Sequence, residues 1–284
     1  MTSMSAGDAP TRTRTRKLRL PATLLAGAVI VLAWLLIAIF GPMLSTRDPI
    51  AVDIAHALLP PSSAYPLGTD SFGRDLLTRL MYGARTDLQM AFFGVAGPLV
   101  IGTTIGLIAG NFGGVLDSIL MRILDITISF PYFVLVIAIV AVLEPGLTSY
   151  YISLTLVNWV SYARLVRSEV IVLRQADFIL AARTIGLRQS RIMTHHLLPN
   201  VISPAVVFVF TDAVLTIVLG SSLGFLGLGV QPPAAEWGVM IAEGQLYLAS
   251  AWWISVFPGI SISLLALGFS LVADGLAKLL QTTP

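Results

Sequence analysis

Long stretches without a charged residue constrain this chain more than any other feature. A helix needs about 20 apolar residues to cross a hydrocarbon core of roughly 30 Å, and transmembrane strands would alternate apolar with polar residues. With 56% hydrophobic and 11% charged residues, and a mean hydropathy of +0.87, the chain is predicted to be an all-α integral membrane protein. The stretches, read as six transmembrane helices, are residues 20–46, 88–116, 126–143, 145–163, 213–235 and 244–273.

The first stretch follows a basic segment and superficially resembles a secretory signal peptide. Its length decides against that interpretation, because the core of a signal peptide has only about 7 to 15 residues. We therefore expect a retained first span that begins near Pro21, a favoured first helical residue. The fifth span is expected to begin earlier than its charge-free part, near Val201, and so to carry Asp212 near its middle.

The distribution of Lys and Arg predicts the orientation in the membrane. If the N-terminus is cytoplasmic, 13 of the 17 Lys and Arg residues lie inside and only four lie outside, as the positive-inside rule requires. The C-terminus is then cytoplasmic too. The predicted segments are a basic cytoplasmic tail (1–20), a first transmembrane helix (21–44), an extracytoplasmic loop (45–87), a five-helix core (88–276) that includes a cytoplasmic loop (174–200), and a cytoplasmic C-terminal tail (277–284).

The cytoplasmic loop carries a short amphipathic helix. Asp177 is a plausible N-cap, and Gly186 suits the left-handed position that ends a helix. Ser190 is expected to cap a second helix, residues 191–198, which Pro199 would end. From the pattern alone, a hairpin lying in the membrane interface explains the loop as well as a docking site does. The apolar face at i, i+3, i+4 and i+7 consists of Phe178, Ala181, Ala182 and Ile185.

Residue identity favours docking. The string Leu180-Ala181-Ala182, then Gly186, then His196-Leu197-Leu198-Pro199-Asn200 resembles the coupling motif of ABC importer permeases. Leu180 replaces the usual Glu and His196 the usual Ile, and both departures are typical of the dipeptide, oligopeptide and nickel branch. The resemblance implies that an ATPase subunit docks here. The residues it assigns to coupling are Phe178, Ala181, Ala182, Ile185, Gly186, His196, Leu198 and Pro199.

Two further stretches resemble the same branch. One lies in the first outer loop and continues through Arg79 to Gly83-Ala84-Arg85. The other is Phe225 to Pro233 followed by Glu236-Trp237-Gly238. The charges of the outer loop are expected to form surface ion pairs that fix a helix on the membrane face, with contact to a binding protein as the alternative. The glycines of the second stretch, 224, 227 and 229, are expected in close packing or at a gate. The outer-loop motif is Gly68, Thr69, Asp70, Gly73, Arg74 and Asp75.

The resemblance implies a type I ABC importer permease fold with a cytoplasmic coupling helix, in the bacterial plasma membrane. It implies an ATP-driven importer in which this chain and a second, homologous permease form the path for a dipeptide or oligopeptide. Nickel, glutathione or another small solute is the alternative cargo. Two ATPase domains would carry ATP and Mg²⁺, and an extracytoplasmic protein would deliver the substrate. This chain itself is expected to be non-catalytic and to need no cofactor, metal or nucleic acid.

Other chemistry has weaker support in the sequence. Two interpretations of Asp212 stay open: it lines the translocation path, or it is a hydrogen-bonded packing residue between spans. His195 and His196 are adjacent and point about 100° apart on a helix, so no metal site is expected. No P-loop motif occurs. A secondary transporter would need internal repeats and ionisable residues at the midplane, and an unspecialised membrane scaffold would leave three ordered motifs to coincidence.

Overall fold

Helices joined by loops make up the part of the chain that the computed structural model describes, residues 20–282. The predicted basic tail lies outside these residues, apart from Leu20. Within them, β-type pairing is limited to one isolated bridge between Thr69 and Asp75. The helices are α1 (Ala22–Leu44), η1 (Ile54–His56), α2 (Leu76–Phe112), α3 (Gly114–Ile128), α4 (Tyr132–Leu143), α5 (Leu147–Leu173), α6 (Asp177–Thr184), α7 (Gln189–Ile192), η2 (Met193–Leu197), α8 (Leu198–Phe225), α9 (Trp237–Gly244), η3 (Gln245–Tyr247) and α10 (Trp253–Thr282).

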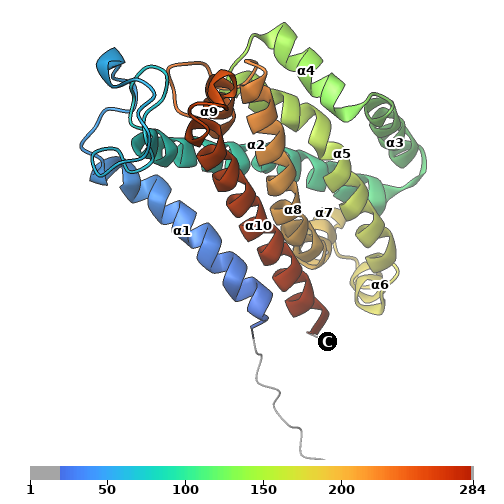
Figure 1. The fold of residues 1–284 in the computed structure, drawn as a ribbon. Coiled ribbons are helices and arrows are strands. Elements are labelled where there is room, and N and C mark those ends of the chain that lie inside the picture. The colour runs from blue at the N-terminus through green and yellow to red at the C-terminus, as the bar shows by residue number, and fades with distance from the viewer. Residues whose placement is uncertain (1–19, 283–284) are drawn as a thin grey trace, which may run out of the picture.

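Close packing of α2 against α5 forms the centre of the bundle. A Cβ at Gly94 would lie 2.8 Å from Leu154 Cδ1, and one at Gly110 would lie 2.8 Å from Val170 Cβ. The order of these contacts shows that the two helices run parallel. Small residues along one face let helix backbones approach closely in a membrane. α8 and α10 pack beside α2 (Figure 1).

The first helix lies along the last one. α1 and α10 run side by side in Figure 1, and Gly27 of α1 lies so close to α10 that a Cβ there would be 2.7 Å from Val272 N. Gly275 meets Leu24 in the same way, with a Cβ distance of 2.6 Å to Leu24 Cα. The half of α1 nearest its N-terminus is therefore held against α10 by backbone contact.

Each of the six predicted stretches coincides with a helix or a bent helix pair. Four helices are long and apolar enough to cross a membrane, namely α1, α2, the run Gln189–Phe225 and α10, and the bent pair α3–α4 would make a fifth. α5 matches the predicted fourth span and has 27 residues. α5 is more polar than these spans, and its mean hydropathy is too low to indicate a membrane span. Length and composition alone therefore support four or five spans rather than six.

The predicted third span, 126–143, is divided in the structure. α3 and α4 meet at 87°, and Pro131 stands at the N-cap of α4 with an extended backbone. Proline lacks an N–H group and disfavours helical geometry in the residue before it, so the helix cannot continue. α3 begins at Gly114, well before residue 126. Its first part was missed because the prediction was based on uncharged stretches, and Asp117, Arg122 and Asp125 lie on this helix.

The loop and tail boundaries also differ from the sequence expectations. α2 begins at Leu76, inside the predicted loop 45–87, and Asp75 caps it by accepting a hydrogen bond from Thr78 N at 2.9 Å. At the other end of the chain, α10 continues to Thr282 and so occupies most of the predicted tail 277–284. A charged residue in the sequence therefore does not mark the end of a helix here, since α2 and α10 both continue past such residues.

Candidate functional site

The predicted coupling helix is α6, which lies at the end of the bundle where α5 ends and α8 begins (Figure 1). Ile179 is fully buried and Ala182 is 5% exposed, and both pack in an apolar cluster with residues of α2, α5 and α8. Phe178, Ala181 and Ile185 remain exposed. The prediction placed Ala182 on the same face as these three, whereas the structure turns it inward. One side of α6 therefore holds the helix in place and the neighbouring side is free for a partner.

The turn after α6 has the expected glycine geometry. Gly186 adopts a left-handed φ of +78°, which an L side chain rarely tolerates. The backbone N–H of Leu187 then bonds to the Ala182 carbonyl oxygen at 3.1 Å, which closes the helix end. The predicted N-cap at Asp177 was wrong, because Ala176 takes that position and no side chain caps the helix.

The predicted second helix, 191–198 with a Ser190 cap and a stop at Pro199, was also wrong. α7 and the π-helical segment η2 lead without a break into α8, and Pro199 lies in the first turn of α8. Pro199 follows the π-helical segment directly, and such a segment interrupts the regular hydrogen-bond ladder at the point where proline has no N–H group to contribute. His196 is half-buried, and its carbonyl oxygen accepts a hydrogen bond from Asn200 Nδ2 at 2.6 Å.

At the opposite end of the bundle, the outer-loop motif forms a compact turn before α2. Gly68 and Gly73 have φ values of +83° and +75°. Thr69 Oγ1 donates to the His56 carbonyl oxygen at 2.6 Å and accepts from Leu59 N at 2.8 Å. The motif therefore closes the loop upon itself before the chain enters the bundle.

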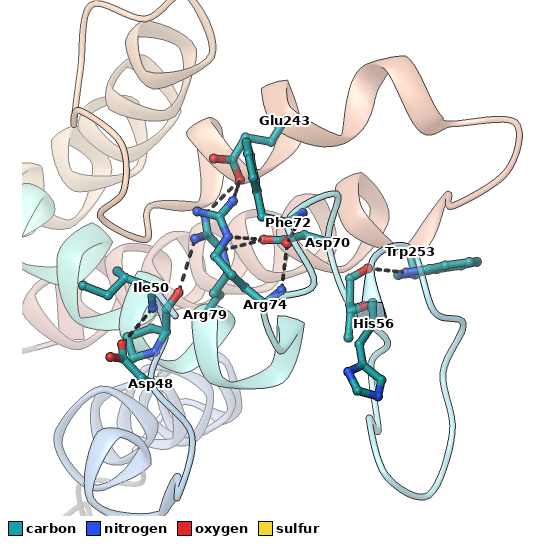
Figure 2. Close-up of polar contacts among 11 residues, drawn as sticks. Asp48, Ile50, His56, Asp70, Phe72, Arg74, Arg79, Glu243 and Trp253 are labelled. Carbon is teal, nitrogen blue, oxygen red and sulfur yellow. Dashed lines mark hydrogen bonds and ion pairs between the residues drawn. The ribbon is translucent and has the colours of Figure 1, made fainter. Parts of the chain in front are cut away.

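Four charged side chains meet beside this turn (Figure 2). Arg74 Nε donates to Asp70 Oδ2 at 2.6 Å, and Arg74 Nη2 donates to Glu243 Oε2 at 2.8 Å. Arg79 Nη2 donates to the same Glu243 oxygen at 2.9 Å, and Arg79 Nε lies 3.4 Å from Asp70 Oδ2. We call these four residues the outer ion cluster. It joins the loop and the start of α2, which are neighbours in the sequence, to α9, which is far from both.

The expectation of surface ion pairs was wrong for this cluster. The side chains of Arg79, Asp70 and Arg74 are 0%, 1% and 4% exposed, and that of Glu243 is 15% exposed. Buried charges are tolerated only when they are paired and hydrogen-bonded. The charges persist here because two guanidinium groups and two carboxylates neutralise each other. Burial of side chains from three elements cannot be read from a run of charges in the sequence.

The stretch from Phe225 to Gly238 packs directly against the stretch that continues the outer-loop motif into α2. Glu236 begins α9 by accepting hydrogen bonds from Gly238 N at 2.7 Å and Val239 N at 2.8 Å. Trp237 Nε1 donates to the Leu80 carbonyl oxygen of α2 at 3.1 Å. A Cβ at Gly238 would overlap the Ser221 carbonyl oxygen of α8, so close packing explains this glycine. The two motifs, predicted separately, form one joint between α2, α8 and α9.

A pair of buried carboxyl groups lies within this joint. Asp87 Oδ2 accepts from Trp237 N at 3.2 Å, and Asp87 Oδ1 lies 3.4 Å from Ser221 Oγ, a donor on α8. Burial raises the pKa of Glu236. Both carboxyl groups accept backbone hydrogen bonds from the first turn of α9, which fixes α9 against α2 and α8.

Asp212, the predicted midspan acid, is fully paired within the bundle. It is 4% exposed, and its carboxylate accepts from Asn158 Nδ2 at 3.2 Å and from Tyr162 OH at 3.0 Å, both on α5. These contacts support the packing alternative, in which Asp212 links α8 to α5.

Several residues of the site carried no signal in the sequence. Glu243 is a single charged residue before an apolar stretch. Only its closeness in sequence to Trp237 indicates that it belongs to the joint between α2, α8 and α9. Trp253 donates from Nε1 to the Thr69 carbonyl oxygen at 3.1 Å and so ties the start of α10 to the outer-loop motif. Across residues 20–282, three or more His, Asp or Glu side chains nowhere gather as a metal site would require.

Comparison with known proteins agrees with this geometry. Residues 102–283 match the family model described as binding-protein-dependent transport system inner membrane component. The chain is 43% identical to the dipeptide transport system permease protein DppC of Alkalihalophilus pseudofirmus, covering 96% of this chain and 90% of that protein. It is 41% identical to a probable D,D-dipeptide transport system permease protein of Escherichia coli, covering 89% and 85%. It is 40% identical to a glutathione transport system permease protein of Pectobacterium atrosepticum, covering 78% and 73%.

Solved structures share the fold. The MetNI methionine ABC transporter in an inward-facing conformation aligns with a TM-score of 0.59 at 19% identity, over 72% of this chain and 96% of that one. An amino acid ABC transporter aligns with a TM-score of 0.54 at 15% identity, over 69% and 91%. This confirms the type I permease fold. The chain therefore belongs to the family of binding-protein-dependent transport system inner membrane components, the transmembrane permease subunits of ABC importers.

Proposed function

We propose that this chain pairs with a second, homologous permease to form the translocation path of an ATP-driven peptide importer in the bacterial plasma membrane. The family and the fold support an importer permease, and the names of the DppC and D,D-dipeptide relatives support a peptide as cargo. The charge distribution supports cytoplasmic termini. ATP and Mg²⁺ would bind to the two ATPase domains, and this chain would convert their movement into opening and closing of the path.

The observation that carries the proposal is the exposed apolar face of α6. Phe178, Ala181 and Ile185 are open on a helix whose other side, Ile179 and Ala182, is fixed in the core. Exposed apolar side chains on a fixed helix fit a groove on a partner protein. Because Ile179 packs with residues of α2, α5 and α8, a push on α6 would reach the spans directly.

The opposite end of the bundle supports docking of a substrate-binding protein. Large apolar side chains are exposed around the outer ion cluster: Val52 is 59% exposed, Phe72 44%, Leu246 84% and Trp252 48%. The Arg74 guanidinium of the cluster lies 4.6 Å from the ring centroid of Phe72, so the cluster supports part of this surface. A delivery protein would find a preformed surface here.

Glutathione is the second candidate cargo. It is itself a small peptide, and a relative named for glutathione transport is 40% identical to this chain. Selectivity would then rest mainly with the binding protein, which delivers one class of small peptide to a shared path.

The test of coupling uses the complete transporter reconstituted in vesicles. Phe178→Asp places a charge on the exposed face of α6, and we expect loss of ATP-driven peptide uptake together with weaker retention of the ATPase subunits. Arg183→Gln, on the other flank of the same helix, serves as the matched control and is expected to transport normally. Unchanged uptake in Phe178→Asp, or uptake by the wild type without ATP, would refute the proposal.

A further inference from the structure

Arg85, at the end of the stretch that continues the outer-loop motif, is not part of the outer ion cluster. Arg85 follows Gly83-Ala84 in α2, yet its side chain is exposed, and within residues 20–282 no carboxylate pairs with it. An arginine within a membrane span costs about 2.5 to 3.5 kcal/mol at the span centre unless it reaches a partner or the interface. Arg85 is therefore expected to reach the membrane interface, where its charge is open to an anion from outside this part of the chain.

Arg85 lines a large apolar groove between α1, α2, α8 and α10. The groove has a volume of about 930 Å³, and its walls include Leu35, Phe92 and Phe210. Gln89, one turn beyond Arg85 on α2, is the other hydrogen-bond donor on the wall. The groove thus combines long apolar walls with two polar side chains on one helix.

The position of Arg85 along the groove matches a lipid headgroup. Gly41, near the outer end of α1, lies against Met81 of α2, with a Cβ distance of 2.9 Å, and Arg85 is one turn further along. Side chains on a helix tilt toward its N-terminus, so that of Arg85 tilts toward the outer-loop side of the membrane. Long basic side chains reach the interface in this way.

The groove is shorter than the membrane is thick. Its lining residues run from Val31 to Met43 on α1 and from Arg85 to Val100 on α2, which corresponds to about 18 Å and about 22 Å at 1.5 Å per residue, against a hydrocarbon core of roughly 30 Å. Nearer its N-terminus, α1 closes onto α10 through Gly27. A transmembrane helix of a partner would need the full thickness, whereas an acyl chain that starts at the outer-loop side does not.

We propose that this groove binds an anionic phospholipid of the leaflet facing the outer loop, with its phosphate on Arg85 and Gln89 and an acyl chain between α1 and α2. Acyl chains are as apolar as leucine side chains, so the tail gives little preference over bulk lipid. The headgroup therefore determines which lipid the groove prefers. The assignment of this leaflet to the outside rests on the proposed orientation, but the binding site itself does not.

The test measures lipid binding to the purified transporter by native mass spectrometry. Delipidated complex is titrated with dioleoyl phosphatidylglycerol or with dioleoyl phosphatidylcholine. One arginine near an anionic headgroup contributes about 1 kcal/mol, or roughly fivefold, so we expect about a fivefold preference for phosphatidylglycerol in the wild type. Arg85→Gln should abolish the preference. Ala96→Phe, which fills the groove, should reduce retention of both lipids.

Arg122→Gln is the matched control, because Arg122 is also exposed and lines a separate hollow on α3. It should leave the preference unchanged. The proposal fails if Arg85→Gln keeps the wild-type preference, or if that variant instead loses the second permease during purification, which would make the groove a protein interface. Failure of coupling in the Phe178→Asp experiment would leave this result unaffected.

Discussion

At the outer-loop end of the bundle, buried charges join three elements, whereas at the opposite end α6 is held by two apolar side chains. Asp70, Arg74, Arg79 and Glu243 fix the loop, α2 and α9 in one geometry, because each charge requires its partners at specific positions. Ile179 and Ala182 hold α6 itself by burial, which is non-directional, and polar bonds from Arg174 and Gln189 fix the chain on either side of it.

The contrast separates a rigid end from an end that can shift. Directional ion pairs in a buried setting lose much of their energy when a partner moves, so the outer end is suited to present a constant surface. Apolar contacts tolerate small displacements, so α6 can shift while staying attached to the core, as the proposed docking of an ATPase requires. The following variants test whether this division is real, in order of decreasing expected effect.

The largest effect is expected from Arg79→Met. Removing one partner from a buried ion cluster leaves an uncompensated charge, which costs about 3 to 5 kcal/mol. Glu243 would lose one of its two arginines, and the loop should detach from α9 before the bundle unfolds. Thermal unfolding of the purified complex measures the loss of stability. The double variant Arg79→Met with Glu243→Gln should recover part of it, and additive losses in the double variant would show that the pair is not coupled.

A smaller effect is expected from Ile179→Ala. Deleting a buried isoleucine side chain costs about 2 to 4 kcal/mol through lost burial and a cavity. Because the contact is local, α6 should loosen while the outer cluster stays intact. Limited proteolysis at the α6 loop, compared with that at the 45–75 loop, measures this directly. Phe178→Ala, on the exposed face, is the control and should leave the protease sensitivity of the isolated permease unchanged. Equal loosening at both ends would contradict the division.

The outer end was harder to predict than the α6 loop. The amphipathic spacing of Phe178, Ala181 and Ile185 is a local property, so the sequence indicated the helix and these three exposed residues, although it placed Ala182 with them and Ala182 is buried. Glu243 reaches Arg74 across 169 positions, and no local pattern connects them. The spans were predicted from uncharged stretches. That criterion missed part of a helix where charged residues lie on it, as Asp117 does on α3. It also missed the bend that Pro131 introduces before α4.

Asp212→Asn separates the two interpretations of the midspan acid. The substitution replaces one acceptor oxygen by a donor, which then faces Asn158 or Tyr162, and an unsatisfied buried group costs about 1 to 3 kcal/mol. We expect a modest drop in unfolding temperature with peptide uptake per folded transporter retained. Tyr162→Phe removes the same hydrogen bond from the other side and is the matched control. Loss of uptake without loss of stability would place Asp212 in the translocation path instead.

The smallest effect is expected from Arg47→Gln, which tests whether burial, and not charge alone, makes the outer end rigid. Arg47 lies 3.3 Å from Asp75, but its side chain is 40% exposed, and exposed ion pairs contribute only about 0 to 1 kcal/mol. Asp75 also keeps its capping bonds to Thr78, so α2 should begin at the same residue. Unfolding measured at low and high salt should show a small loss that disappears at high salt, whereas the loss in Arg79→Met should persist. A loss in Arg47→Gln as large as that in Arg79→Met would mean that the exposed charges of the loop also hold the outer end together.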